Sequence, residues 1–329
     1  MANLSKRKRR ERARLLEALG FRRNGQGYYG WPDEGYEVPP GGLPTPDVAV
    51  RERVLREYIP PWHAVNGKAA HLTPPEMGRA LVGQVAHLIP GARVLEPCAG
   101  IGHLIEEIGQ YGPAEIHAWE WEAEMIAILP ILHPEITAQQ ANMWAAWQEH
   151  EAAFDLIIAN PPFGNTCGRG TGEGLEFNGK MAEFLSIKAI VRLLKPSGTA
   201  ALILPSMAFG GNRWGPMNRW LDEQGVSVTG DFRLPNVPFA FTKAAVKGFL
   251  LQKAGANGAG LALTEEVEEE KEELGLASPQ ALLRQLQEGS QEITAHLQQL
   301  QEMLEGTQPP LFQPEDLPGP VQLSLFGGT

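Results

Sequence analysis

The sequence predicts a doubly wound α/β sheet, and three observations support this fold class. Short apolar runs of strand length alternate with longer segments of helical spacing through the middle of the chain. One run leads into a Gly-x-Gly turn that opens an amphipathic helix, from Glu96 to Leu104. Another run ends in Asn160-Pro161-Pro162-Phe163. The expected strands are 92–96, 115–120, 135–138, 154–159, 199–204, 226–232 and 244–251. The expected helices are 75–88, 101–109, 122–129, 180–194 and 215–223.

The tetrapeptide after strand 154–159 builds a pocket for a flat group that carries an amine. The side-chain oxygen of Asn160 accepts a hydrogen bond from an N–H. Pro161 fixes φ and Pro162 favours an extended residue before it, so a backbone carbonyl can point the same way. Phe163 offers a stacking face. An exocyclic amine held by two acceptors becomes nucleophilic, as methylation of adenine N6 requires. The alternative is a turn with a stacking aromatic residue.

The segment from Glu96 to Gly102 resembles a nucleotide-binding turn, although no third glycine follows. Gly100 and Gly102 let the backbone approach a ligand closely. The carboxylate of Glu96 suits the ammonium group of S-adenosylmethionine better than a pyrophosphate. Glu120 ends the next strand, where an acid would bind two ribose hydroxyls, with Trp121 against the adenine. The alternative for Glu120 is a solvated strand end.

Taken together, these motifs resemble the γ-class amino methyltransferases that make N6-methyladenine in DNA. The resemblance covers roughly residues 66–253 and follows the family's order of motifs. The matching segments are the Thr-Pro motif at 71–77, the glycine turn at 96–102, the acid at Glu120, the catalytic loop at 160–163, the helix-turn-strand at 193–205 and the last hairpin strand at 239–251.

The resemblance implies a Rossmann-like methyltransferase fold with a seven-stranded mixed sheet, a helical C-terminal extension and S-adenosylmethionine as cofactor. It implies that Asn160 and the carbonyl of Pro161 hold N6 of a flipped adenine. Phe163 and Phe239 would stack on the base, with Phe241 as the alternative to Phe239. The implied cofactor-binding residues are Thr73, Pro74, Glu96, Pro97, Gly100, Gly102, Glu120, Trp121, Asn142, Met143 and Asn160. Asn142 stands where the family has an acid.

The chain has 329 residues, a formal net charge of −11 and two cysteines, which form neither a disulfide framework nor a metal-binding spacing. No apolar run reaches membrane-spanning length, so we expect a cytoplasmic protein that binds no metal. We expect a basic arm and Pro-rich linker at 1–65, the catalytic domain at 66–254, an acidic linker and helical or coiled-coil segment at 255–306, and a disordered tail at 307–329.

Both ends of the chain carry candidate interaction segments. Basic residues from Lys6 to Arg14 read as a short helix that ends near Gly20, suited either to DNA phosphates or to solubility. Leucines and isoleucines between 283 and 304 recur at helical spacing, which favours docking on the catalytic domain, a homodimer or a partner coiled coil. The tail residues Gln322, Leu323, Leu325 and Phe326 resemble a peptide that binds the bacterial sliding clamp, and a weaker version lies at 308–312. The alternative is a tail that docks on its own chain.

The sequence therefore predicts an adenine-specific DNA methyltransferase with low or partner-supplied sequence specificity, of the kind found in restriction–modification systems. The glycine-rich stretch 164–179 would close over the flipped nucleotide, although a merely disordered loop fits equally well. Two alternatives stay open. One is the same chemistry on guanine N2 of ribosomal RNA or on a protein glutamine. The other is a non-catalytic, clamp-tethered adaptor with a methyltransferase fold.

Overall fold

The computed structural model describes residues 6–24, 35–61, 72–164, 175, 181–237, 239 and 245–255. Four of the predicted features lie outside these residues: Phe241, most of the glycine-rich stretch 164–179, the helical segment at 255–306 and the tail with Gln322, Leu323, Leu325 and Phe326. Within the described ranges, every helix is too short or too polar to span a bilayer.

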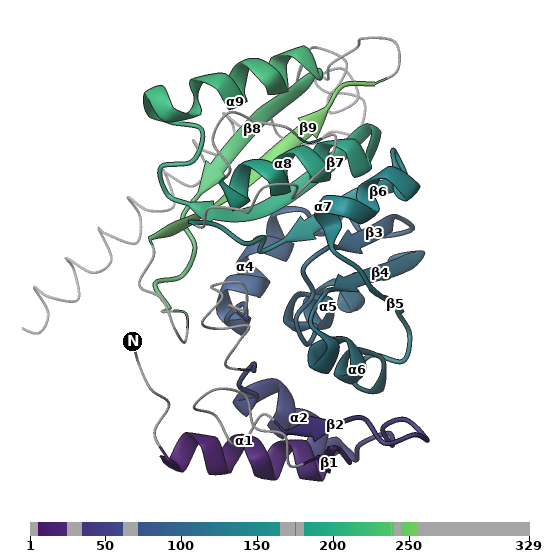
Figure 1. Cartoon of the computed structure of the whole chain (residues 1–329). Helices are drawn as coiled ribbons and strands as arrows, with labels where there is room; N and C mark the ends of the chain where they lie inside the picture. Colours follow the sequence, from purple (N-terminus) through teal and green to yellow (C-terminus); the bar gives the residue numbers. More distant parts are fainter. Residues whose placement is uncertain are drawn as a thin grey trace, which may run out of the picture. The chain divides into compact units, whose positions relative to one another are not determined.

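A seven-stranded mixed sheet forms the centre of the described structure (Figure 1). Its strand order is β5-β4-β3-β6-β7-β9-β8, and only β9 runs antiparallel to its neighbours. The strands are β3 (Arg93–Glu96), β4 (Glu115–Glu120), β5 (Thr137–Gln140), β6 (Phe154–Ala159), β7 (Leu194–Pro205), β8 (Val226–Phe232) and β9 (Val246–Lys253). The predicted fold class is confirmed.

Two apolar cores lie on opposite faces of this sheet, because successive strand residues point to opposite sides. Leu95 and Ile157 belong to the core shared with α8 and α9, whereas Val94 and Leu156 belong to the core shared with α4 and α5. The helices on the first side are α7 (Met143–Ala146), α8 (Ala182–Leu193) and α9 (Gly211–Glu223), with the 3-10 turn η3 (Trp147–His150). Those on the second side are α4 (Pro75–Gln84) and α5 (His103–Ile108), with the 3-10 turns η1 (Ala86–Leu88) and η2 (Gly109–Tyr111). Helix α6 (Ala123–Leu132) contributes Leu129 to this second core and Met125, Ile128 and Leu132 to a third.

The strand order positions the candidate site. From β3 the chain runs outward through β4 to β5 and then returns to the other side of β3 as β6. The carboxyl ends of β3 and β6 therefore flank the point where the winding direction reverses, which is where open α/β sheets bind ligands. Glu96 ends β3 and Asn160 directly follows β6.

An N-terminal module packs on α6. It consists of α1 (Lys6–Ala18), β1 (Arg22–Arg23), β2 (Tyr36–Glu37) and α2 (Val48–Glu57). Three leucines of α1, Leu15, Leu16 and Leu19, are buried together with side chains of α2 and α6 in the third apolar core. The predicted helix ending near Gly20 is confirmed, since Gly20 has a φ of 91° and follows the last turn. The Pro-rich region holds a short strand and is followed by α2, which the sequence analysis missed.

Arg12 corrects the expectation that the whole basic segment is available for phosphate. Its side chain is 0% exposed, and its Nη2 lies 2.6 Å from both carboxylate oxygens of Glu124 on α6. Its Nε donates to the carbonyl of Ile59 at 3.0 Å. A buried guanidinium must be paired, so Arg12 holds α1 against α6 and is not available to DNA.

Candidate active site

Asn160 is tied to the Thr-Pro segment that precedes α4. Its Nδ2 donates to Oγ1 of Thr73 at 3.1 Å, and Thr73 is 6% exposed. This bond fixes the plane of the amide whose carbonyl oxygen is the predicted acceptor for a substrate amine. Pro161 is buried, while Pro162 and Phe163 are partly exposed. The structure thus brings together two motifs that lie 87 residues apart in the chain.

Glu96 is the most unusual group of the site. It is 2% exposed, and within the described residues its Oε2 has no hydrogen-bond partner. Burial raises the pKa of Glu96 well above its usual range, and the neighbouring carboxylate of Glu120 adds to this effect. A buried carboxylate without a partner is unfavourable, and a bound cation would relieve this. The ammonium group of S-adenosylmethionine fits this requirement.

Glu120 ties the end of β4 to the glycine turn. Its Oε2 accepts from the N–H of Gly100 and its Oε1 from the N–H of Glu122, both at 2.8 Å. Burial raises the pKa of Glu120, and the backbone hydrogen bonds oppose that shift. Because a carboxylate oxygen accepts more than one hydrogen bond, Glu120 can hold the turn and still receive two hydroxyls. The neighbouring Trp121 is 64% exposed, so its ring is available to a ligand.

The other predicted cofactor-binding residues differ in their burial and in their contacts. Asn142 caps α7, and its side chain accepts from the N–H of Trp144 at 3.0 Å. Met143 is buried, with its Sδ 3.8 Å from Sγ of Cys98. Pro97 is buried in the glycine turn, and Pro74 precedes α4. Phe239, predicted to stack on the target base, is 4% exposed and packs in the core shared with α4, so its stacking role stays a prediction.

The two glycines of the turn are needed for packing as well as for ligand approach. Gly100 and Gly102 have φ values of 57° and 92°, where side chains are strained. A Cβ at Gly102 would lie 2.3 Å from Nε2 of His133, and one at Gly100 would lie 2.8 Å from Cδ2 of Leu72. His133 and Leu72 therefore pack against the turn from outside, and the sequence analysis assigned a role to neither of them.

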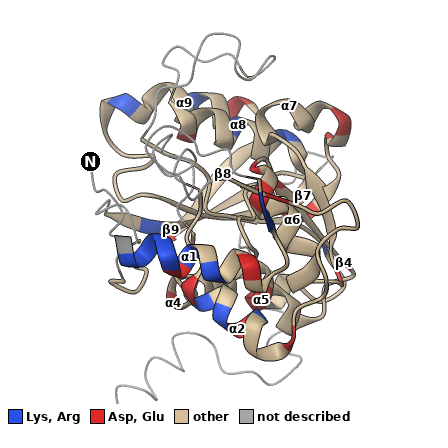
Figure 2. Cartoon of the chain, turned by 60° about the horizontal axis from the view of Figure 1, so that its bottom comes forward, with Lys and Arg blue, Asp and Glu red and all other residues tan. Residues whose placement is uncertain are grey.

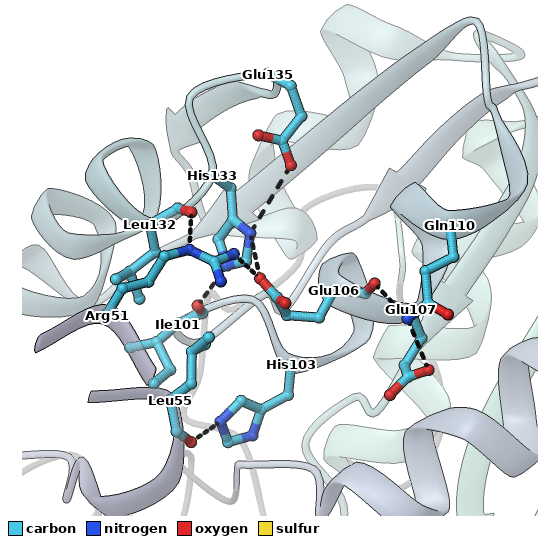
Figure 3. Close-up of polar contacts among 10 residues, drawn as sticks. All are labelled: Arg51, Leu55, Ile101, His103, Glu106, Glu107, Gln110, Leu132, His133 and Glu135. Carbon is cyan, nitrogen blue, oxygen red and sulfur yellow. Dashed lines mark hydrogen bonds and ion pairs between the residues drawn. The ribbon is translucent and has the colours of Figure 1, made fainter. Parts of the chain in front are cut away.

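A polar cluster behind the turn supports it (Figure 3). His133 is fully buried and its Nε2 donates to the carbonyl of Ile101 at 3.0 Å, which fixes the tautomer. Its Nδ1 faces Glu106 at 3.2 Å, and Glu106 also pairs with Arg51 of α2. Burial lowers the pKa of His133 despite the nearby carboxylates. No sequence motif marks His133, since only the fold brings it to the turn.

His103 connects the same turn to both neighbouring segments. Its Nδ1 lies 2.8 Å from the carbonyl oxygen of Thr73. Its Nε2 lies 2.7 Å from the carbonyl oxygen of Leu55 in α2 (Figure 3). Either neutral tautomer forms one of these hydrogen bonds, and the imidazolium forms both. The N-terminal module is thus linked through His103 to Thr73, and through Thr73 to Asn160.

Basic residues gather on the N-terminal module, over α1 and α2 (Figure 2). Lys8, Arg10 and Arg14 are exposed, in contrast to Arg12. Arg7 is 87% exposed but pairs with Glu11 one turn along the helix. The exposed members form a candidate surface for a phosphate backbone.

The fold and this arrangement of acids, glycines and Asn160 define an S-adenosylmethionine-dependent methyltransferase fold. The chain belongs to the family described as N-6 DNA Methylase, whose model matches residues 52–273, more than half of the chain. Membership of this family implies S-adenosylmethionine as methyl donor. A comparison with curated protein sequences gave no match.

Solved structures resemble the chain in fold. A protein from a study of assembly and conformational transition in the type I R-M system has a TM-score of 0.50 at 18% identity, over 79% of this chain and 70% of that one. A chain described as the modification subunit of a type I restriction enzyme from Vibrio vulnificus YJ016 has a TM-score of 0.49 at 20% identity, over 63% and 49%. The type I restriction-modification methyltransferase subunit from Streptococcus thermophilus has a TM-score of 0.47 at 20% identity, over 57% and 45%. This chain spans about half the length of the last two proteins.

Proposed function

We propose that this chain transfers a methyl group from S-adenosylmethionine to N6 of adenine in DNA. The observation that carries the proposal is the hydrogen bond from Asn160 to Thr73 at the carboxyl end of β6, together with Oε2 of Glu96 at the end of β3, which has no hydrogen-bond partner among the described residues. In this proposal Asn160 accepts a hydrogen bond from the substrate amine, and Glu96, at the end of the neighbouring strand, binds the cofactor's cation. Family membership and type I restriction–modification proteins among the similar structures support DNA adenine as the substrate.

Each residue of the site has a separate part in this proposal. Glu96 holds the ammonium group of the cofactor, and Glu120 receives the ribose hydroxyls on its remaining lone pairs. Trp121 covers the cofactor adenine with its exposed face. Thr73, Pro74, Pro97, Gly100, Gly102, Asn142 and Met143 complete the cofactor site.

The cofactor supplies an activated methyl group, so the protein needs to position the amine and does not need a strong base. The side-chain oxygen of Asn160 and the carbonyl of Pro161 accept the two N6 hydrogens of a flipped adenine. Phe163 stacks on the base, and Phe239 does so from the other side once the base is bound. The proton on N6 leaves to solvent.

Sequence specificity in this proposal is low or is supplied by a partner subunit. Proteins of the type I R-M system, to which this fold is similar, form complexes according to the description of one of them. Two further candidate partners are predicted from sequence alone. One is the bacterial sliding clamp, through the segment around Leu325 and Phe326, and the other is a chain that would form a coiled coil with the segment between 283 and 304.

The test is to incubate the protein with labelled S-adenosylmethionine and separate pools of duplex DNA, single-stranded DNA, RNA and protein. The label is then identified by mass spectrometry of nucleosides and amino acids. We expect N6-methyladenine in a DNA pool. Label found only as N2-methylguanine in RNA, or as methylglutamine in protein, would replace this assignment with one of the other amine substrates.

Asn160→Ala should reduce methyl transfer by at least about a hundredfold, because the variant loses a hydrogen bond formed to the reacting amine. Binding of S-adenosylmethionine should stay within a few-fold of the wild type. Asn236→Ala, at an exposed asparagine outside the site, is the matched control and should change neither quantity. Wild-type turnover in the Asn160 variant would contradict the assigned role.

A further inference from the structure

A cavity of about 480 Å³ lies on the α8 and α9 side of the catalytic tetrapeptide. Its walls include Phe163, Met181, Met207 and Trp214. Its volume falls within the range of small-molecule sites in proteins, roughly 300 to 1,000 Å³. Neither Asn160 nor Glu96 belongs to the described lining, whereas Phe163 does, so this cavity adjoins the amine site across Phe163.

The apolar walls of the cavity are rigid and partly aromatic. Trp214 is 4% exposed and is held edge-on by Phe184, with ring centroids 4.7 Å apart and an interplanar angle of 81°. Phe163 is partly exposed, and Met207 is 72% exposed, which is unusual for a large apolar side chain. Flat apolar walls with an exposed methionine suit a heterocyclic ring more than a charged ligand.

Within the described lining, the cation at this cavity is Arg213, which is connected to the catalytic loop through Glu183. Arg213 has a 58% exposed side chain, and its Nη2 lies 3.1 Å from Oε1 of the buried Glu183. The other oxygen of Glu183 accepts from the N–H of Gly164 at 2.9 Å. Because Gly164 directly follows Phe163, Glu183 fixes both the aromatic wall and the guanidinium beside it. The exposed guanidinium retains donors for an anion, and a planar fork matches a phosphate.

We propose that this cavity binds the nucleotide next to the target adenine on the same DNA strand. Its base lies against Phe163 and Met207, and its phosphate is bound by Arg213. This inference rests on the proposed function, because the shared wall at Phe163 places the cavity next to the flipped adenine. Stacking and a guanidinium are tolerant of sequence, so the cavity would hold the strand without selecting one base.

The experiment uses a short oligonucleotide without adenine, tetrathymidylate with one 5-iododeoxyuridine, and no cofactor. After irradiation, cross-linked residues are mapped by mass spectrometry, and affinity is measured by fluorescence anisotropy of the labelled oligonucleotide. We expect cross-links at Phe163 or Met207. Arg213→Gln should weaken binding about tenfold, as loss of a charged hydrogen bond does. Arg213→Lys should retain most of the affinity.

Arg219→Gln, on the exposed surface of the same helix and outside the cavity, is the matched control and should bind like the wild type. Thermal melts of all three variants show whether the loss of the Glu183 partner unfolds the protein, and the lysine variant keeps that partner. Cross-links at the cavity with the Arg213 effect support this site even if no adenine is methylated. Cross-links elsewhere, or equal affinities of the Arg213 and Arg219 variants, overturn it even if adenine is methylated.

Discussion

Glu124 and Glu96 are both largely buried, but they differ in their hydrogen-bond partners. Glu124 has a side chain that is 12% exposed, and its oxygens accept from Arg12 and from the hydroxyl of Tyr58. Glu96 is 2% exposed, and its Oε2 has no partner in the described part of the chain. In the sequence, both glutamates lie in or beside an apolar segment, and nothing there distinguishes their partners. The structure separates a carboxylate that is paired with a buried cation from one whose Oε2 has no hydrogen-bond partner among the described residues.

The difference explains how the two regions behave. In the third apolar core, where α1 meets α6, the buried cation Arg12 is paired with the acid Glu124 of the same chain. At the glycine turn, burial and the carboxylate of Glu120 raise the pKa of Glu96, so the charged form of Glu96 is unfavourable without a cation.

The largest expected effect is on the docking of α1. Arg12→Ala should lower the free energy of unfolding by about 3–5 kcal/mol, because it leaves the carboxylate of Glu124 without its cation. Arg10→Ala, at an exposed position of the same helix, is the control and should change little. Urea titrations give both values. If the two variants are equally stable, the buried pair does not hold the module in place.

The pH dependence of stability should reveal the raised pKa of Glu96. A carboxyl with a raised pKa in the folded state stabilises the fold fully below its unfolded pKa, and this stability is lost as pH rises through the folded pKa. Since the pKa of Glu96 is raised, the cofactor-free protein should lose stability as pH rises from about 4.3, the ordinary pKa of a glutamate, through the raised pKa of the folded state. Glu96→Gln should flatten this decline and melt higher than the wild type at pH 8. Parallel melting curves against pH would contradict the raised pKa.

The smallest expected effect concerns the exposed arginines of α1. Arg10→Gln and Arg14→Gln should each reduce the salt dependence of DNA binding by about 0.9 in the slope of log affinity against log salt, if each contacts one phosphate. Stability should not change, because both side chains are exposed. These point variants are preferable to removal of residues 1–14, which would also remove the buried Arg12. An unchanged slope would leave the basic residues a solubilising role.

Much of the fold could be predicted because its strands are short, apolar and bounded by turns. Strand β8 lies at 226–232 and β6 at 154–159, as predicted. Strand β5 begins two residues later than predicted, at Thr137, because His133 and Ile136 form a turn first. Strand β7 begins at Leu194, five residues before the apolar run, since its first part pairs with β6 around a bulge. Helix α2 was missed because prolines precede it.

The candidate site was predictable where one segment carries the chemistry. The turn from Glu96 to Gly102 and the loop at Asn160 could be read directly from neighbouring residues. The contacts that hold them could not, because His133, Arg51 and Glu183 reach the site only through folding. The prediction that Arg12 is available to phosphate was wrong for the same reason. A cation in a basic run gives no sign that it will be buried and paired with an acid 112 residues away.

Calorimetry of cofactor binding tests the central claim about Glu96 most directly. S-adenosylmethionine carries an ammonium group, whereas 5′-methylthioadenosine keeps the adenosine portion and lacks the amino acid. Glu96→Gln should weaken binding of S-adenosylmethionine about 10- to 100-fold, the effect of one hydrogen bond to a charged group. Its affinity for 5′-methylthioadenosine should stay within about twofold of the wild type. Equal losses for the two ligands, or unchanged affinity for S-adenosylmethionine, would contradict the assignment of this carboxylate to the cofactor's cation.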